Sequence, residues 1–285
     1  MDAPLPSGVP GCERILVGMA KSFAVLGSPI EHSKSPAIHL AAYRELGLDW
    51  SYSKVQVEAA ELADFLQNSN LAGCSLTMPL KDRAFALANC QDEAAIKASA
   101  ANTLVRVGEN WLGYNTDVFG LCKALENISF DSVAIIGSGA TARNAVIAVQ
   151  QLNPQAALQV LARSESAGNA LVGFAIALGL NATFALAPLN VTSVDLVIST
   201  VPAAADVSAW FTGTPTNTLL DVAYSPWPSR LASHWVAGGG NVVSGIEMLV
   251  WQAIAQIRVF LNGNVAEPLP NEPLLAQIMR AAAAE

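Results

Sequence analysis

The stretch Val133-Ala134-Ile135-Ile136-Gly137-Ser138-Gly139-Ala140-Thr141-Ala142 decides the fold of this 285-residue chain. It places the pattern G-x-G-x-x-A directly after an apolar run typical of a strand, and before a helical segment expected to reach about Leu152. Gly137 allows the tight turn, Gly139 lets the backbone approach a pyrophosphate, and Ala142 permits close packing of helix on strand. The helix N-terminus then favours the anion. An ordinary glycine-rich turn is the alternative, but this context predicts a dinucleotide-binding unit.

Short apolar runs alternate with helical segments from Lys21 onward. This alternation is typical of an α/β fold with a mainly parallel sheet. The expected strands are 22–26, 51–57, 73–77, 133–136, 158–162, 196–200, 219–222 and 241–243. The dinucleotide-type unit begins near Ser132, and the polar clusters before it lack its signature. Together with the length of the chain, this predicts two domains.

The composition excludes several classes of protein. Hydrophobic residues make up 52% of the chain and charged residues 13%, which excludes intrinsic disorder. The net charge is −8 and no basic cluster occurs, so we expect no nucleic-acid partner. The four cysteines and three histidines stand at spacings that fit neither a metal site nor a disulfide framework. We therefore expect no metal.

The stretch 166–194 has no charged side chain and raises the question of a membrane span. Its uninterrupted apolar part, Ala170 to Leu180, has 11 residues, whereas a span needs about 20. We interpret it as a buried helix and expect no membrane contact. Residues 1–18 have neither the basic nor the apolar region of a secretory signal. We expect them to form a disordered extension of a cytoplasmic protein.

The end of the next strand indicates which dinucleotide is bound. NAD enzymes place an acidic residue there, roughly 20 residues past the loop, to bind the ribose hydroxyls. Here Arg163 and Ser164 take that place. A guanidinium can form two charge-assisted hydrogen bonds with a 2'-phosphate and the serine can add a hydroxyl, so NADP is favoured. Glu165 weakens this interpretation, and a solvated surface arginine is the alternative.

Polar clusters that precede the unit supply candidate substrate-binding groups. They are Gly27-Ser-Pro-Ile-Glu-His-Ser-Lys-Ser-Pro36, Ser75-Leu-Thr-Met-Pro-Leu-Lys81, and Ala101-Asn-Thr103 with Asn115-Thr-Asp117. Each is expected where a strand ends or a helix begins, and ligands of open α/β sheets bind at the carboxyl ends of strands. Ser33 and Ser35 can converge on one anionic or hydroxylated group. Ser35 before Pro36 would also suit a helix N-cap.

Lys81 is the candidate for proton transfer. A proline opens the helix that contains it, so the lysine stands in the first turn, where the helix dipole disfavours positive charge. A lysine so placed can give a proton to a carbonyl oxygen as a hydride arrives, and take it back in the reverse reaction. Asp117, at the start of a later helix, is the candidate carboxylate that holds the ammonium. A solvated lysine and a helix N-cap are the plainer alternatives.

Taken together, the motifs resemble those of the shikimate dehydrogenases. The clusters above, with Ala-Asn-Thr-Leu104, the glycine loop, Asp221-Val-Ala-Tyr-Ser-Pro226 and Ser244-Gly-Ile-Glu-Met-Leu-Val-Trp-Gln252, follow in that family's order from about Phe23 to Leu261. The resemblance implies a Rossmann-type NADP(H)-binding domain, 118–245, and an α/β substrate domain, 19–117, completed by carboxyl-terminal helices within 246–285. It also implies reversible reduction of 3-dehydroshikimate to shikimate, a step of aromatic amino acid biosynthesis, in a monomer or homodimer.

Roles follow from matching positions in that family. Ser33 and Ser35 would bind the substrate carboxylate, with help from Tyr224. The ring hydroxyls would be bound by Thr77, Asn102, Asp117 and Gln252. Lys81 and Asp117 match the catalytic pair. The cofactor would contact Gly137, Gly139, Ala140, Ala142, Arg163, Ser164, Thr200, Val222, Gly245 and Met248, the last two closing over the nicotinamide.

Some positions depart from the family pattern. Ser75 stands where the family usually has asparagine, and the loop reads Gly-Ser-Gly-Ala-Thr rather than Gly-Ala-Gly-Gly-Ala. Ala167 replaces a second basic residue of the phosphate clamp, which predicts weak NADP affinity or relaxed cofactor choice. Trp251 replaces a small residue and would narrow the substrate site.

Other functions stay open. The related NAD-dependent quinate/shikimate dehydrogenases tend to carry threonine in place of Ser35 and an acidic residue in place of Arg163. A non-catalytic NADP-binding sensor has no need of both Lys81 and Asp117. A folate- or tRNA-linked enzyme on a similar two-domain fold would need another pattern around the lysine, or a basic surface.

Overall fold

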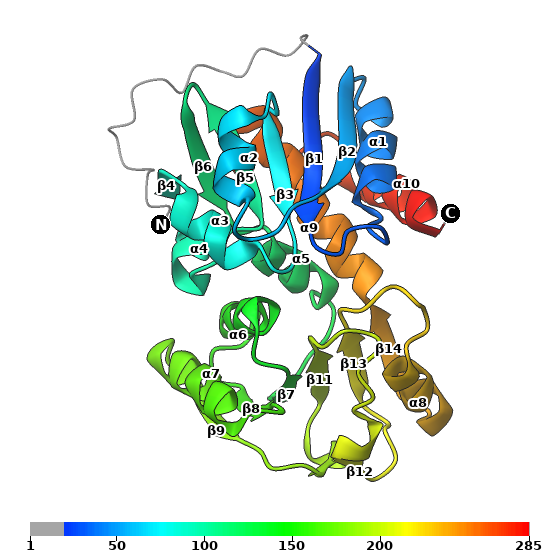
Figure 1. Cartoon of the computed structure of the whole chain (residues 1–285). Coiled ribbons are helices and arrows are strands. Elements are labelled where there is room, and N and C mark those ends of the chain that lie inside the picture. Colours follow the sequence, from blue (N-terminus) through cyan, green and yellow to red (C-terminus); the bar gives the residue numbers. More distant parts are fainter. Residues whose placement is uncertain (1–19, 285) are drawn as a thin grey trace.

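The computed structural model describes residues 20–284, so the expected disordered extension at residues 1–18 lies outside the described residues. Two six-stranded sheets carry the fold, and they occupy the upper and lower halves of the molecule in Figure 1. Over the described range, no helix has both the length and the apolar character that crossing a membrane requires.

The first sheet has the strand order β2-β1-β3-β5-β6-β4. Its strands are β1 (Lys21–Gly27), β2 (Trp50–Gln56), β3 (Gly73–Leu76), β4 (Cys90–Gln91), β5 (Thr103–Val107) and β6 (Asn110–Tyr114). β1 pairs in parallel with β2 and β3, as the sequence predicted. β5 runs antiparallel to β3 and β6, and the sequence did not predict this hairpin.

Helices cover both faces of this sheet because side chains along β1 alternate between them. Phe23 and Val25 pack on one face with the helices α1, α9 and α10, and Ala24 and Leu26 pack on the other with α2 and α3. The helices are α1 (Ser35–Glu45), α2 (Leu62–Asn68), α3 (Lys81–Leu87), α4 (Glu93–Ala98), α9 (Gly245–Asn262) and α10 (Glu272–Ala284). The carboxyl-terminal helices thus complete the amino-terminal half.

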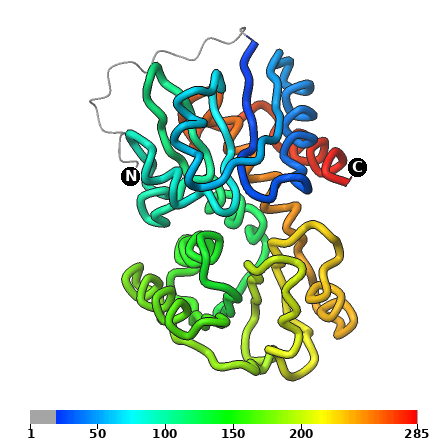
Figure 2. The backbone as a smooth tube through the Cα atoms, in the orientation of Figure 1, coloured from blue at the N-terminus to red at the C-terminus, as the bar shows by residue number. Residues whose placement is uncertain are grey.

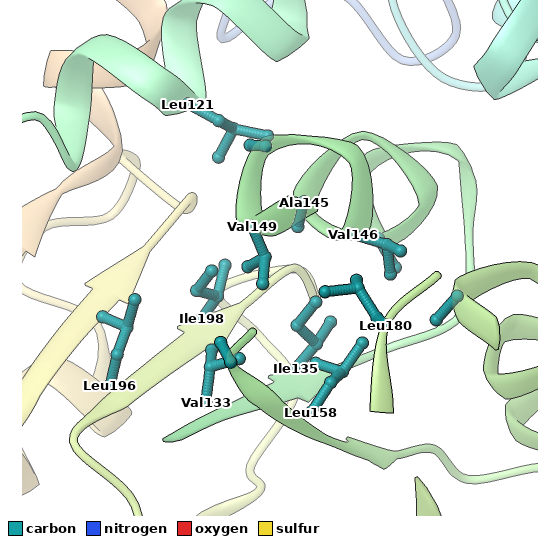
Figure 3. Close-up of a cluster of buried hydrophobic side chains, with 14 of the residues drawn as sticks. Leu121, Val133, Ile135, Ala145, Val146, Val149, Leu158, Leu180, Leu196 and Ile198 are labelled. Carbon is teal, nitrogen blue, oxygen red and sulfur yellow. The ribbon is translucent and has the colours of Figure 1, made fainter. Parts of the chain in front are cut away.

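The second sheet has the order β14-β13-β11-β7-β8-β9, and all its strands are parallel. Its strands are β7 (Ser132–Ile136), β8 (Ala157–Leu161), β9 (Asn181–Phe184), β11 (Leu196–Ser199), β13 (Thr218–Asp221) and β14 (Asn241–Ser244). The helices that cover it are α6 (Ala140–Leu152), α7 (Glu165–Ala177) and α8 (Arg230–Gly238). Figure 3 shows the core where Val133, Ile135 and Ile198 of the sheet meet Val146 and Val149 of α6.

The uncharged stretch 166–194 does not form the predicted buried helix. α7 takes up its first part, and of this helix only Gly168, Leu171 and Ala175 are buried. Ile176, one residue further on, is 56% exposed. The prediction was wrong because it rested on composition: uncharged residues such as Asn169, Ala170 and Gly173 take up most of the exposed face of α7, where charged residues are more usual.

The two halves are joined by α5 (Asp117–Ala124) and α9. Figure 2 shows the chain entering the lower half after α5 and returning to the upper half through α9. The two helices approach closely at Gly120, where an added Cβ would lie 2.7 Å from the carbonyl oxygen of Met248 and 2.9 Å from Cβ of Gln252. Only glycine allows this approach.

We predict that Gly120→Ala lowers the free energy of unfolding, measured by urea denaturation. Alanine gains about 1 kcal/mol in helix propensity, but overpacking against the α9 backbone costs typically 1–3 kcal/mol. The matched control is Gly173→Ala in α7, an exposed glycine with nothing within 4 Å of an added Cβ. That variant should gain roughly 0.5–1 kcal/mol. Equal stability of the two variants would contradict the close approach.

Candidate active site

A cavity of about 330 Å³ lies between the two halves and brings the predicted substrate residues together. Its lining includes Ser33, Ser35, Thr77, Lys81, Asn102, Asp117, Tyr224 and Gln252 from these predictions, and also Val222, Gly245 and Met248 from the predicted cofactor set. An adjoining hollow of about 580 Å³ shares Thr77, Lys81 and Tyr224 with it, and is bordered further by Gly139, Ala140, Ala142 and Thr200. The space for a small ring therefore opens into the space beside the glycine loop.

Strand direction explains why these residues meet. Thr77 follows β3, and Thr200, Val222 and Gly245 follow β11, β13 and β14, so the carboxyl ends of both sheets border the same space. Asn102 was expected at a strand end or a helix start, but it precedes β5. Because β5 runs antiparallel to β3, its first residues lie at the edge where β3 ends.

Lys81 and Asp117 form an ion pair in the cavity, with 2.6 Å between Nζ and Oδ2. Each is the first residue of its helix, α3 and α5. The solvated-lysine alternative does not hold, because the Lys81 side chain is only 14% exposed. The N-cap alternative for Asp117 is also wrong, since Thr116 takes the cap position.

The carboxylate of Asp117 accepts hydrogen bonds on both oxygens. Oδ1 accepts from Nδ2 of Asn102 at 2.7 Å, and Oδ2 accepts from Nδ2 of Asn144 at 3.0 Å as well as from Lys81. Asn102 is itself fixed, because its Oδ1 accepts from the backbone N–H of Thr116 at 2.8 Å. The position of the carboxylate is thus set by donors on three sides.

Three hydroxyls in the cavity are available to a ligand. Within residues 20–284, no side-chain hydrogen bond engages the hydroxyl of Ser35, Thr77 or Tyr224. Burial raises the pKa of Tyr224, so its hydroxyl stays protonated and can donate. The N-cap alternative for Ser35 is wrong, because Lys34 precedes α1 at the cap position and the Oγ of Ser33 accepts from the backbone N–H of Ser35 at 3.3 Å.

Sequence reasoning missed Gln256, a buried amide that lines the cavity next to Ser75. The Oγ of Ser75 donates to Oε1 of Gln256 at 2.9 Å and lies 2.6 Å from the hydroxyl of Tyr52. Tyr52 stacks on His39, with 3.9 Å between ring centroids, and burial lowers the pKa of His39 to about 4. The sequence did contain a signal for Gln256, because this residue stands four residues after Gln252 and therefore lies on the same face of α9.

The glycine loop has the geometry that its motif predicts. Gly137 has a φ of +111°, and a Cβ there would collide with Oγ1 of Thr200. Gly139, the N-cap of α6, has nothing within 4 Å of an added Cβ, so the backbone there faces open space. Ala142 is fully buried against the sheet. These residues fit a pyrophosphate at the start of α6.

The predicted 2'-phosphate clamp lies apart from both hollows. Arg163 is exposed and borders a separate depression of about 250 Å³ with Glu165, Leu186 and Trp210. It forms no salt bridge with any described residue. The Oγ of Ser164 caps α7 by accepting from the backbone N–H of Ala167 at 3.3 Å.

Trp251 does not narrow the cavity, contrary to the expectation from sequence. Its ring packs against the core of the first half, and Nζ of Lys123 lies 4.9 Å from the ring centroid. The residue is next to Gln252 in sequence, but consecutive residues of a helix point about 100° apart. Gln252 faces the cavity and Trp251 does not.

Comparison with known proteins identifies the family. The model of the shikimate dehydrogenase substrate binding domain matches residues 25–104. A shikimate dehydrogenase (NADP(+)) of Staphylococcus aureus is 27% identical over 84% of this chain and 92% of its own length.

Solved structures agree over nearly the whole chain. Shikimate dehydrogenase of Mycobacterium tuberculosis is 35% identical, with a TM-score of 0.80 over 93% of this chain and 99% of that one. The enzyme of Thermus thermophilus, solved with NADP(H) and shikimate, is 27% identical, with a TM-score of 0.77 over 92% and 99% of the two chains. The predicted two-domain α/β fold with a Rossmann-type half is confirmed. The chain belongs to the shikimate dehydrogenase family.

Proposed function

We propose that this protein catalyses the reversible reduction of 3-dehydroshikimate to shikimate with NADPH. Family membership makes it an NADP-dependent oxidoreductase. The observation that carries the finer proposal is the Lys81–Asp117 ion pair in a cavity lined by hydroxyl and amide side chains, next to the glycine loop. A ring that carries a carboxylate, hydroxyls and one ketone suits this lining.

The chain supplies binding and proton transfer. The hydroxyls of Ser33, Ser35 and Tyr224 bind the substrate carboxylate, and Thr77, Asn102, Asp117 and Gln252 orient the ring hydroxyls. Bound NADPH supplies the hydride. Lys81 gives a proton to the ketone oxygen as its charge develops, and takes a proton from the alcohol in the reverse direction. Asp117 holds the lysine in line for both directions.

The remaining assignments are proposals of the same kind. The nucleotide unit is 118–245, and the substrate unit is 19–117 with 246–285. Gly137, Gly139, Ala140 and Ala142 hold the pyrophosphate, and Thr200, Val222, Gly245 and Met248 border the nicotinamide. Arg163 and Ser164 bind the 2'-phosphate. We also propose a monomer or homodimer that acts in the cytoplasm in aromatic amino acid biosynthesis.

The first test follows the absorbance of the reduced nicotinamide with shikimate or quinate, each with NADP or NAD. We expect the highest kcat/KM with shikimate and NADP, because the cavity offers hydroxyl partners and Arg163 offers a cation. Faster turnover of quinate with NAD would favour the related quinate/shikimate dehydrogenase. Absence of turnover in all four combinations would exclude the proposed enzymatic activity and favour a non-catalytic NADP-binding sensor.

Lys81→Ala should lower kcat by roughly 10²–10⁴ and leave substrate binding largely intact, because the variant loses the proton donor. Steady-state kinetics and substrate titration separate the two effects. Lys97→Ala in α4 is the matched control, since this lysine pairs with Glu93 outside the cavity and should leave both parameters unchanged. A change confined to KM would show that Lys81 binds the substrate and does not transfer the proton.

Arg163→Ala should raise KM for NADP and not for NAD, because only NADP carries the 2'-phosphate. The same assay with Arg44→Ala, an exposed arginine of α1, controls for loss of surface charge. Equal effects of Arg163→Ala on both cofactors would rule out the phosphate role.

A further inference from the structure

Asn144 is a buried polar residue that the sequence analysis did not single out. It lies in α6, the helix that begins at the glycine loop, and none of its surface is exposed. It lines neither the cavity nor the adjoining hollow. Asn144 therefore does not touch substrate or cofactor, and a buried amide requires hydrogen-bond partners within the protein.

The side-chain amide nitrogen and oxygen of Asn144 both form hydrogen bonds to residues at the start of α5 or just before it. Nδ2 donates to Oδ2 of Asp117 at 3.0 Å, and Oδ1 accepts from Nδ2 of Asn115 at 2.9 Å. Asn115 is fixed by the backbone, because its Nδ2 also donates to the carbonyl of Ala100 and its Oδ1 accepts from the N–H of Asp117. With Asn115 unable to flip, Asn144 must turn its N–H toward the carboxylate.

This donor matters most at the moment of proton transfer. Oδ2 of Asp117 is shared by Lys81 and Asn144, and the Asp117 residue is only 4% exposed. When Lys81 gives up its proton, the carboxylate loses the attraction of the ammonium. The fixed N–H groups of Asn144 and Asn102 then keep the buried charge solvated and in place.

The neighbouring residue ties the same helix to the same site. Nε of Arg143 donates to the carbonyl of Ala98 at 2.8 Å, and its NH2 group pairs with Asp82 at 2.5 Å. Asp82 directly follows Lys81 in α3. The start of α6 is thus attached to both members of the catalytic pair, to Asp117 through Asn144 and to the lysine's helix through Arg143.

We propose that Asn144 is a positioning residue that aligns Asp117 for proton transfer and links it to the helix at the dinucleotide loop. The inference rests on the proposed function, in which Lys81 transfers the proton and Asp117 holds it. Through this contact, a dinucleotide bound at the start of α6 and the catalytic carboxylate share one rigid element.

The test compares Asn144→Ala and Asn144→Asp with the wild type across pH, for kcat, KM and NADP binding. Asn144→Ala should lower kcat about tenfold to a hundredfold at every pH, the factor for one hydrogen bond to a charged group. NADP affinity should change less than threefold, roughly, since Asn144 borders neither hollow.

Asn144→Asp has nearly the same shape as the wild type and provides a readout that a merely structural role would not move. While protonated, the new carboxyl donates to Asp117, so kcat should approach the wild-type value at low pH. As pH rises it ionises beside Asp117, and kcat should fall relative to the wild type because like charges repel. If the ratio of kcat in Asn144→Asp to kcat in the wild type does not change with pH, the proposal is overturned. A wild-type kcat in Asn144→Ala would overturn it as well.

Asn153→Ala is the matched control. Asn153 ends the same helix and donates to the carbonyl of Phe130 at 2.8 Å, far along α6 from the glycine loop. It should lose stability without loss of kcat. If the wild type fails to turn over shikimate, crystal structures still test this proposal separately from the proposed function. In Asn144→Ala the 2.6 Å distance between Nζ of Lys81 and Oδ2 of Asp117 should lengthen. An unchanged distance would overturn the positioning role.

Discussion

The burial of the Asp117 carboxylate is the constraint on which the rest of the site depends. Removing a partner from a buried ion pair costs about 3–5 kcal/mol, because it leaves a charge without compensation. The chain meets this constraint with donors from Lys81, Asn102 and Asn144. Lys81 lies in α3, Asn102 in the loop that precedes β5, and Asn144 in α6. The charge is therefore compensated only when the two halves of the molecule are correctly placed against each other. The fold and the proposed catalytic pair are therefore stabilised by the same contacts.

The close packing of α5 against α9 sets the second condition. Asp117 begins α5, and the glycine three residues later lets α9 approach until its backbone is in contact. α9 then presents Gln252 and Gln256 to the cavity from the opposite end of the sequence. Because α9 also packs into the core of the first half, a shift of this helix would displace both amides together.

The sequence predicted those parts of the site that local chemistry determines. The turn at Gly137 needs a positive φ, and Lys81 needs only its place after a strand and a proline, so both are visible in a few residues. Asn144 and Gln256 were missed because their partners lie 27 and 181 residues away. The sequence also did not show that Asn102 reaches the cavity from the start of an antiparallel strand, β5, because short apolar runs do not reveal strand direction. The prediction that α7 is buried was wrong because a helix with a single charged residue can still expose one face to water.

The two ends of the proposed dinucleotide site differ in how strongly the fold constrains them. The glycine loop is held by close contacts, among them Gly137 against Thr200 and Ala142 within the core. Arg163 is exposed and forms no salt bridge among the described residues, so its attraction for a phosphate acts in water and is weakened by salt. Arg163 is exposed, whereas removing the carboxylate of Asp117 takes an acceptor from Asn102 and leaves the buried amide N–H of Asn144 without one. In the proposed roles, preference between NADP and NAD can therefore change at little cost in stability, while the Lys81–Asp117 pair cannot.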